Sequence, residues 1–402
     1  MAGALADVRV IDLGTVIAQP YNTGLLADLG AEVIKIAEPA AAERAATGAA
    51  LRFRNPNLIP MGIYRDRNKE SISLNLRHPK GVALLKELVR QGDVVIENFS
   101  PGTMDRMAVG YEVLRAVNPR IIYGAVSAFG QTGPYSHHRG YDILAQARTG
   151  YGSVTGFPHQ PPTRAGNSIT DYYAGLLCAF AVLAALRHRE RTGEGQAIDI
   201  ALFEALFMQL EGYVERAKND GEVLSRQGNE SLTHGPSCAA YESQDGWLAV
   251  DAHRDEWWAG LSRALEQPEM ARDPRLSTYA ARRDNADLVR STLASWVAAR
   301  TSEEGERRLL DAGVPAARVL TVAEMVESPQ VKARGVYATV VHANAGRQTI
   351  TGTPFGHLSE TPGQVHSAPP LANQHVRPVL KRVLGYTDEQ IEELEAEGVF
   401  RA

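Results

Sequence analysis

The chain opens with Val8-Arg9-Val10-Ile11-Asp12-Leu13 and continues, after one helix length, with Glu32-Val33-Ile34-Lys35-Ile36. Both stretches are short apolar runs of the kind that form buried strands. Residues 20–29 between them are predicted to form a short helix. A strand, a helix and a second strand in this order indicate a βαβ unit with parallel strands.

The same alternation continues through the next hundred residues. An amphipathic helix is expected over 79–91, because Val82, Leu85 and Leu88 fall on one side of it. Further strands are expected over 93–97 and 120–126, with a helix over 111–117 between them. Strands separated by helix-length connections predict a doubly wound, Rossmann-like α/β domain, which we place over residues 1–220.

The pattern changes after residue 220, where a smaller α+β domain is expected over 221–325. Two strands, 239–242 and 247–250, flank the tight-turn sequence Gln244-Asp245-Gly246. Helices are expected near 256–265, 287–300 and 302–312. Residues 326–402 are expected to return to the large domain and to close with a helix, whose Thr387-to-Gln390 spacing fits a capping box.

Composition limits the function classes. With 402 residues, 22% charged and 44% hydrophobic, the chain resembles an ordinary soluble enzyme, and its net charge of −5 argues against a nucleic-acid partner. No apolar run approaches the roughly 18 residues that span a bilayer, so no membrane partner is expected. The N-terminus lacks signal-peptide features, and the two cysteines, Cys178 and Cys238, fit a reducing compartment. The cytoplasm is therefore the expected location.

Several familiar cofactor sites have no counterpart in the sequence. The turn after the first strand reads Gly14-Thr15-Val16-Ile17-Ala18, which is not the glycine pattern of a dinucleotide-binding domain. No P-loop and no Gly-x-Ser-x-Gly sequence occurs, and the histidines lack metal-ligand spacing. We therefore expect no nicotinamide, flavin or metal cofactor.

A carboxylate stands at the start of the most apolar helix of the chain. The sequence Ser168-Ile169-Thr170-Asp171 precedes an apolar run that ends at Gly193. The Ser168-to-Asp171 spacing fits a capping box, in which Asp171 has a structural role. The alternative is that Asp171 is a catalytic carboxylate at the edge of the core. The local pattern favours capping and leaves both interpretations open.

Two basic or turn-forming segments indicate an anionic ligand. Five cations lie within eighteen residues: Arg52, Arg54, Arg65, Arg67 and Lys69. The turn Asn98-Phe99-Ser100-Pro101-Gly102 follows a predicted strand, and Arg106 comes one helical turn later. Backbone N–H groups and a guanidinium at such a place suit a phosphate. A solvated loop and a surface arginine are equally good interpretations of each segment alone.

An ordered series of short motifs resembles the family III CoA-transferases, the carnitine and formyl-CoA transferase group. The pieces run along nearly the whole chain: Ala27-Asp28-Leu29-Gly30-Ala31-Glu32, Asn68-Lys69-Glu70-Ser71-Ile72, Glu97-Asn98-Phe99-Ser100-Pro101-Gly102, Phe129-Gly130-Gln131-Thr132-Gly133-Pro134, Gly140-Tyr141-Asp142, Thr192-Gly193-Glu194-Gly195-Gln196 and Leu384-Gly385-Tyr386-Thr387. Asp171 falls at the position of that family's catalytic aspartate.

The resemblance implies transfer of CoA from an acyl-CoA to a carboxylic acid, through an aspartyl anhydride and an aspartyl-CoA thioester on Asp171. CoA is then a substrate, and no cofactor is bound permanently. The positions that match the family's CoA site are Val16, Asn68, Lys69, Asn98, Phe99 and Arg106. The resemblance also implies a Rossmann-like large domain, a small domain and an interlocked homodimer.

The sequence departs from the family in places that concern the substrate. Formyl-CoA transferases carry a run of four glycines that closes over the intermediate, whereas this chain reads Leu232-Thr233-His234-Gly235-Pro236-Ser237. A basic residue of some members is replaced by Ala128. Tyr141, Arg164 and His234 are expected to contact the substrate. Arg164 is expected to pair with a distal carboxylate, as in succinyl-CoA, although a surface arginine is an equal alternative.

Two other functions stay open within the same superfamily. An α-methylacyl-CoA racemase uses a histidine base at the position that Tyr141 occupies here. A phenol with a pKa near 10 is a poor base at neutral pH, which disfavours this alternative. An inactive CoA-binding member is the second alternative, and the presence of Asp171 counts against it.

Overall fold

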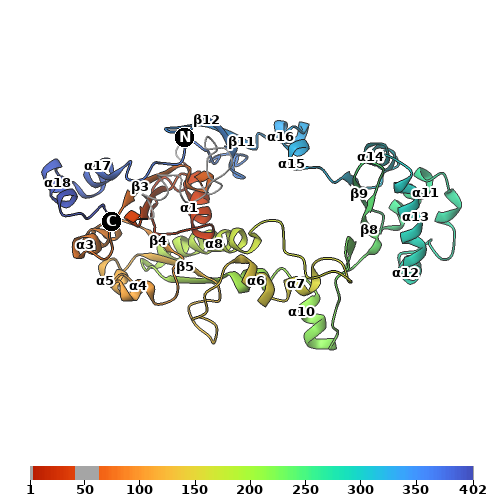
Figure 1. The fold of residues 1–402 in the computed structure, drawn as a ribbon, viewed down its shortest axis with the longest axis horizontal. Helices are drawn as coiled ribbons and strands as arrows, with labels where there is room; N and C mark the ends of the chain where they lie inside the picture. Colours follow the sequence, from red (N-terminus) through yellow and green to blue (C-terminus); the bar gives the residue numbers. More distant parts are fainter. Residues whose placement is uncertain (1–2, 41–62, 402) are drawn as a thin grey trace. The chain divides into compact units, whose positions relative to one another are not determined.

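The computed structural model describes residues 3–40 and 63–401, and the chain separates into two compact units. The first unit comprises Met1–Tyr151, Ala165–Glu211 and Arg334–Ala402, and the second comprises Gly152–Arg164 and Gly212–Ala333 (Figure 1). The segment 152–164 thus belongs to the second unit, although both its neighbours in the sequence belong to the first.

A six-stranded sheet forms the centre of the first unit. Its strands are β1 (Arg9–Asp12), β2 (Glu32–Ala37), β3 (Lys69–Ser73), β4 (Val94–Glu97), β5 (Ile122–Ser127) and β6 (Ala197–Ala201). They lie in the order β3-β2-β1-β4-β5-β6 and all neighbouring pairs are parallel. The predicted α/β fold class is confirmed. The strand order reverses between β1 and β4, where proteins of this architecture bind ligands.

Helices cover both faces of this sheet because successive strand residues point to opposite sides. Val10 belongs to the hydrophobic core under α1 (Ala18–Asp28) and α8 (Ile169–Thr192), whereas Ile11 belongs to the core on the other face. That second core packs against α3 (Pro79–Arg90), α5 (Tyr111–Val117) and the C-terminal helices. The sheet is therefore doubly wound, as the sequence predicts.

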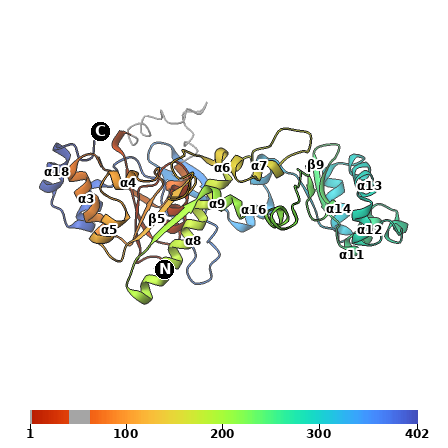
Figure 2. The same cartoon turned by 90° about the horizontal axis from the view of Figure 1, so that it is seen from below.

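The helices α1 and α8 approach each other closely at Gly175. A Cβ atom at this position would lie 2.4 Å from the carbonyl oxygen of Ala18, so only glycine fits there. Figure 2 shows α8 running along the sheet beside β5, which it contacts. The start of α8, and with it Asp171, is held by this packing.

The helix α8 is longer and more apolar than the sequence analysis expected of any segment of the chain. An 18-residue window of this helix has a mean hydropathy of 1.7, and α8 is therefore long and apolar enough to cross a membrane. The expectation that no apolar run approaches this length is wrong. The same composition occurs in core helices of soluble proteins, and Ala174, Cys178 and Val182 of α8 are buried in the first core.

The C-terminal segment packs on the first unit. After the hairpin β11 (Tyr337–His342) and β12 (Gly346–Thr351), the chain forms α17 (Val376–Val379), η4 (Leu380–Leu384) and α18 (Asp388–Ala396). Figures 1 and 2 place α18 beside α3, and Lys80 of α3 forms ion pairs with Glu393 and Glu397. The predicted capping box of Thr387 and Gln390 is present.

The second unit has a four-stranded antiparallel sheet in the order β10-β9-β8-β7. The strands are β7 (Glu230–Ser231), β8 (Gly235–Glu242), β9 (Trp247–Asp251) and β10 (Ala316–Arg318), and the main helices are α11 (Asp255–Ala264), α13 (Ala286–Ala298) and α14 (Ser302–Asp311). The predicted hairpin is confirmed by the β8–β9 pairing, with Glu242 opposite Trp247. Trp258 and Leu293 are buried in its core.

The remaining elements are short. They are η1 (Ile63–Asp66), α4 (Thr103–Arg106), α6 (Asp142–Arg148), α7 (Tyr151–Val154), α9 (Leu202–Phe207), α10 (Tyr213–Glu215), η2 (Arg216–Asp220), η3 (Pro268–Ala271), α12 (Tyr279–Asp284), α15 (Val322–Val326) and α16 (Pro329–Arg334).

Candidate active site

Asp171 lies in the first turn of α8 and its side chain is half-buried. Burial first, and then the charge of nearby Asp142, raise the pKa of this carboxyl to about 6, and the guanidinium of Arg65 opposes both effects. Within the described part of the chain no group donates a hydrogen bond to the Asp171 carboxylate. The helix N-terminus favours its charged form. Asp171 is thus a partly desolvated carboxylate that no described residue hydrogen-bonds, and it is more basic than an ordinary aspartate.

The cap of α8 comes from another helix. Ser168 makes no side-chain capping bond, so the predicted capping box is absent. Instead, Oδ1 of Asp142 in α6 accepts hydrogen bonds from the Thr170 amide (3.1 Å) and the Thr170 hydroxyl (2.8 Å). Gln146 donates to the other oxygen of Asp142 at 2.8 Å. The interpretation of Asp171 as a capping residue is therefore wrong, and Asp142 is a site residue whose role the sequence analysis missed.

Val16 and Asn98 meet where the strand order reverses. The Thr15 amide donates to Oδ1 of Asn98 at 2.8 Å, and Nδ2 of Asn98 donates to the Thr15 carbonyl at 2.8 Å. These bonds join the loop after β1 to the loop after β4. Val16 follows directly, with a φ of 61° and 61% of its surface exposed. The loops thus place two of the expected CoA-site residues side by side.

Phe99 and Arg106 lie in the turn and short helix that follow β4. The Phe99 amide donates to the buried Glu97 carboxylate at 2.7 Å, and the Phe99 ring packs against the second core. Burial raises the pKa of Glu97 to about 7. Arg106 is exposed and donates to the Thr103 hydroxyl at 2.8 Å. Its side chain forms no ion pair among the described residues, which leaves its charge available to an anion.

Lys69 is buried, and its ammonium group is bound within the protein. Its Nζ contacts Oδ2 of Asp12 at 3.0 Å, Oδ1 of Asp66 at 2.8 Å and the Pro20 carbonyl at 2.9 Å. Direct contact of Lys69 with CoA stays a prediction. In the structure Lys69 ties β3 to the base of the β1–α1 connection.

Asn68 is also buried, with its amide group bonded to other parts of the first unit. It donates to Oδ1 of Asp28 at 3.0 Å and to the Gln364 carbonyl at 2.7 Å, and its Oδ1 accepts from the His366 amide at 2.8 Å. Its φ is 62°. Asn68 thus holds the 364–366 segment in place, and its expected contact with CoA stays a prediction.

The prediction of a basic surface is wrong for the three of these cations that the structure describes, because their side chains are buried. Arg65, Arg67 and Lys69 are only 6%, 3% and 3% exposed. Arg67 forms a two-point ion pair with the buried carboxylate of Asp28, with N–O distances of 3.0 and 2.5 Å. Arg52 and Arg54 lie outside the described residues. A run of cations in the sequence is here largely a set of buried ion pairs.

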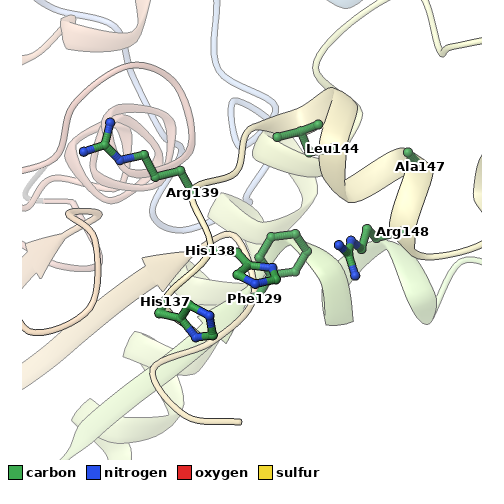
Figure 3. Close-up of a pocket in the computed structure, with 7 residues that line it drawn as sticks. All are labelled: Phe129, His137, His138, Arg139, Leu144, Ala147 and Arg148. Atoms are coloured by element: carbon green, nitrogen blue, oxygen red, sulfur yellow. The ribbon is translucent and has the colours of Figure 1, made fainter. Parts of the chain in front are cut away.

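A cavity of about 520 Å³ opens beside α6 (Figure 3). Figure 3 shows the His138 ring next to that of Phe129, with Arg148 following along α6. The lining residues are Phe129, His137, His138, Arg139, Leu144, Ala147 and Arg148. The guanidinium of Arg148 also stacks over the Tyr135 ring at 4.6 Å. Apolar walls with several basic groups suit an organic anion.

The three expected substrate residues fall in both units. Tyr141 lies directly before α6 and is 67% exposed, next to the capping residue Asp142. Arg164 is exposed and belongs to the second unit, as does His234. The pairing of Arg164 with a substrate carboxylate stays a prediction.

His234 belongs to a cluster of polar aromatic residues in the second unit. Its ring stacks on that of His253, with centroids 3.9 Å apart and planes 10° apart. Tyr279 donates its hydroxyl proton to the Thr233 carbonyl at 2.7 Å, so its oxygen accepts from Nδ1 of His234 at 3.2 Å. Burial and then His253 lower the pKa of His234.

Two of these cluster residues, His253 and Tyr279, were missed in the sequence. Nδ1 of His253 lies 2.6 Å from Oδ1 of Asp251. The two residues are two positions apart in the sequence, and they meet where β9 ends at Asp251. Neither residue lies near His234 in the sequence, and no local pattern connects them.

Comparisons with known proteins give a consistent result. Residues 5–376 match the family model described as CoA-transferase family III. A succinyl-CoA–D-citramalate CoA-transferase from Chloroflexus aurantiacus is 37% identical, covering 98% of each chain. A succinyl-CoA:mesaconate CoA-transferase from Haloarcula marismortui is 36% identical, covering 93% of this chain and 94% of the relative. The crystal structure of a CaiB/BaiF family protein from Brucella suis has a TM-score of 0.82 and 30% identity, covering 95% of this chain and 100% of that one.

Proposed function

Because the chain belongs to CoA-transferase family III, we propose that it moves CoA from succinyl-CoA to a second dicarboxylic acid through intermediates on Asp171. The observation that carries this proposal is the cap of α8. Asp142 takes the capping role, which leaves Asp171 as a half-buried carboxylate with a raised pKa of about 6. The names of the relatives from Chloroflexus and Haloarcula support a succinyl-CoA donor and a dicarboxylic acceptor.

The proposed reaction starts with attack of the Asp171 carboxylate on the thioester carbonyl carbon. The C–S bond breaks, CoA leaves as a thiolate, and a succinyl–aspartyl anhydride forms. The thiolate then attacks the aspartyl carbonyl, which releases succinate and leaves an aspartyl-CoA thioester. The acceptor carboxylate attacks this thioester, which breaks the C–S bond, expels CoA as a thiolate and forms an acceptor–aspartyl anhydride. The thiolate then attacks the acceptor carbonyl of this anhydride, which gives the new acyl-CoA and frees the carboxylate of Asp171. No net proton transfer is required, and Asp171 is regenerated as a carboxylate.

The raised pKa of Asp171 suits this chemistry. A carboxylate with a conjugate acid near pH 6 is still ionised at neutral pH, and it is a stronger base than an exposed aspartate. Partial desolvation also removes water that would hydrolyse the anhydride. We therefore assign the nucleophile to Asp171 and its positioning to Asp142.

We propose that CoA binds where the strand order reverses, next to Val16 and the turn after β4. Arg106 supplies an exposed cation for a phosphate, and Phe99 supplies an aromatic ring at the same turn. Lys69 and Asn68 support the elements around this site through their buried bonds to Asp12 and Asp28. CoA enters and leaves as a substrate, and no cofactor stays bound.

The second carboxylate of the substrate is proposed to pair with Arg164, while Tyr141 and His234 are proposed as further substrate contacts. A guanidinium binds a carboxylate through two parallel hydrogen bonds, which discriminates a dicarboxylyl from a simple acyl group. The test compares succinyl-CoA with acetyl-CoA as donors. Comparable turnover with both donors would remove this part of the proposal.

We further propose that the chain forms a homodimer whose two subunits are interlocked, as the family resemblance implies. Its proposed location is the cytoplasm. The support is an apolar stripe along α8, where Leu176, Phe180 and Leu183 are 43%, 71% and 37% exposed. A stripe of this kind on a long apolar helix needs a cover. A second copy of the chain provides that cover without a membrane or a nucleic acid.

The test is mass spectrometry of the enzyme mixed with succinyl-CoA and quenched with hydroxylamine or borohydride. Modification confined to Asp171, together with loss of CoA exchange in Asp171→Ala, is the expected result. Exchange that persists in Asp171→Ala contradicts the proposed nucleophile. Wash-out of α-deuterium from a 2-methylacyl-CoA would instead favour the racemase alternative.

A further inference from the structure

We infer that Asn98 is a positioning residue, which holds Val16 in a left-handed backbone conformation so that the loop after β1 can receive acyl-CoA. This inference rests on the proposed function, because it assigns Asn98 a role in CoA binding. It differs from the expectation from family resemblance, in which Asn98 touches CoA directly.

The first observation is a two-point bond between Asn98 and one peptide unit on each side of Thr15. The Asn98 oxygen accepts from the Thr15 amide and its nitrogen donates to the Thr15 carbonyl, both at 2.8 Å. The Thr15 hydroxyl also lies 3.3 Å from the Asn98 oxygen. Both polar groups of the Asn98 side chain are therefore bonded to the loop.

The second observation is the backbone of Val16. Its φ of 61° places a β-branched residue in the left-handed region, which is unfavourable for such side chains. Val16 is also 61% exposed, so burial of its side chain does not compensate for this conformation. Strain of this kind persists only where neighbouring contacts fix the backbone.

The contacts that fix this backbone come from both sides of Val16's loop. On one side, the Gly14 amide donates to Oδ1 of buried Asp12 at 2.7 Å, and Lys35 donates to the Gly14 carbonyl at 2.9 Å. On the other side stands Asn98, which the β4 turn holds in place. Because Asp12 and Lys35 hold the backbone of Gly14, the peptide groups on either side of Thr15 are the next ones along the loop that could rotate. The two bonds from Asn98 prevent this rotation.

An asparagine side chain suits this place because it carries both a hydrogen-bond donor and an acceptor. A carboxylate in its position would accept from the Thr15 amide but repel the Thr15 carbonyl. An alanine would offer neither bond. Without Asn98, Val16 is expected to leave the left-handed region and to carry its exposed side chain and amide away from the reversal point between β1 and β4.

The test is a double-mutant cycle with Asn98→Ala and Val16→Gly. Asn98→Ala is expected to lower kcat/KM for succinyl-CoA by roughly 5- to 30-fold, the population cost of an unsupported left-handed residue. In the Val16→Gly background the same change is expected to cost only about 2-fold, because glycine populates this region without a penalty. This rescue separates backbone positioning from a direct contact, which glycine would not restore.

Asn118→Ala is the matched control. Asn118 also bridges backbone groups, since it donates to the Val89 and Gly92 carbonyls at 3.0 and 2.9 Å, but it lies outside the proposed site. This variant is expected to lose stability while kcat/KM stays within about 2-fold of the wild type. A crystal structure of Asn98→Ala is expected to show Val16 with a negative φ.

The outcomes separate this inference from the proposed function. An equal cost of Asn98→Ala in both backgrounds would overturn the inference, as would a Val16 that keeps its positive φ in the alanine variant. The same cycle is measured on CoA affinity by calorimetry. A rescue in CoA affinity without any succinyl-CoA exchange supports the role of Asn98 and rejects the proposed reaction. A wild-type chain that binds no CoA rejects both.

Discussion

Replacement of Asp171 by asparagine is expected to abolish CoA transfer and, at neutral pH, to stabilise the fold. The carboxyl has its pKa raised from 3.8 to about 6, mainly by burial and then by the charge of Asp142. A folded state that binds the proton more tightly than the unfolded state loses stability when the group ionises. Asparagine has nearly the same shape and no charge, so it removes this cost.

The magnitude follows from the shift. About two pH units correspond to at most about 3 kcal/mol, and screening by solvent at the half-buried side chain reduces the expected gain to about 1–2 kcal/mol. The sign depends on pH. The cost is absent below the unfolded pKa of 3.8, grows as the pH rises, and is complete above about 6. The stability difference should therefore shrink in acid.

Urea unfolding of the wild type and Asp171→Asn, at about pH 7.5 and about pH 5, measures this difference. Asp142→Asn is the control, because Asp142 accepts bonds from Thr170 and Gln146 and its replacement should destabilise the fold. Equal stability of Asp171→Asn and the wild type at neutral pH would refute the reasoning. So would an advantage that is the same at both pH values.

The same pKa also sets the acid limb of the reaction. The nucleophile must be ionised, so kcat of the wild type is expected to fall as the pH drops below about 6. A pH–rate profile with constant activity down to pH 5 would contradict the assignment of this pKa to the nucleophile.

Three further changes test the scaffold around the site. Lys69→Met removes the nearer of the two ammonium groups beside the fully buried Asp12, at 3.0 Å, and leaves the more distant Lys35, at 3.8 Å; it should cost about 3–5 kcal/mol in urea unfolding, whereas loss of an exposed pair would cost little. Gly175→Ala places a Cβ atom 2.4 Å from the Ala18 carbonyl oxygen, and the resulting shift of α1 should cost about 1–3 kcal/mol and lower Tm. Phe180→Asp should leave the circular dichroism unchanged but convert the proposed dimer to a monomer in analytical ultracentrifugation; an unchanged sedimentation coefficient would contradict the role of the α8 stripe.

The sequence predicts the fold well where strands are apolar. β4 and β5 are continuous runs of buried residues, and the segments 8–13 and 32–37 that contain β1 and β2 are mostly apolar, so their pattern identifies them directly. β3 was missed because it begins with Lys69 and contains Glu70, Ser71 and Ser73. Lys69 and the two serines are buried in the structure, and Lys69 is accommodated by the carboxylate of Asp12. The sequence pattern of one strand does not show which side chain of another strand will neutralise its buried charge.

The candidate site shows the same limit. The Ser168-to-Asp171 spacing predicts a capping box, but the Thr170 amide bonds instead to Asp142, 28 residues away in the sequence. Asp142 was visible only as part of a motif, without a role. The basic segment was misread for a related reason, since the acidic partner of Arg67 is Asp28 in an earlier helix. The sequence shows which residues are charged, whereas the exposure of their side chains depends on partners that the tertiary structure brings close.

The return of residues 334–402 to the first unit has a consequence for folding during synthesis. The second unit is inserted between parts of the first, and its long segment 212–333 leaves the ribosome before the C-terminal helices do. The Asn75 amide pairs with the Val399 carbonyl, and the Ser71 carbonyl accepts from the His375 amide. The α3 face of the central sheet is therefore completed only after the second unit has been synthesised. Until then, its second core exposes apolar surface that a chaperone can bind.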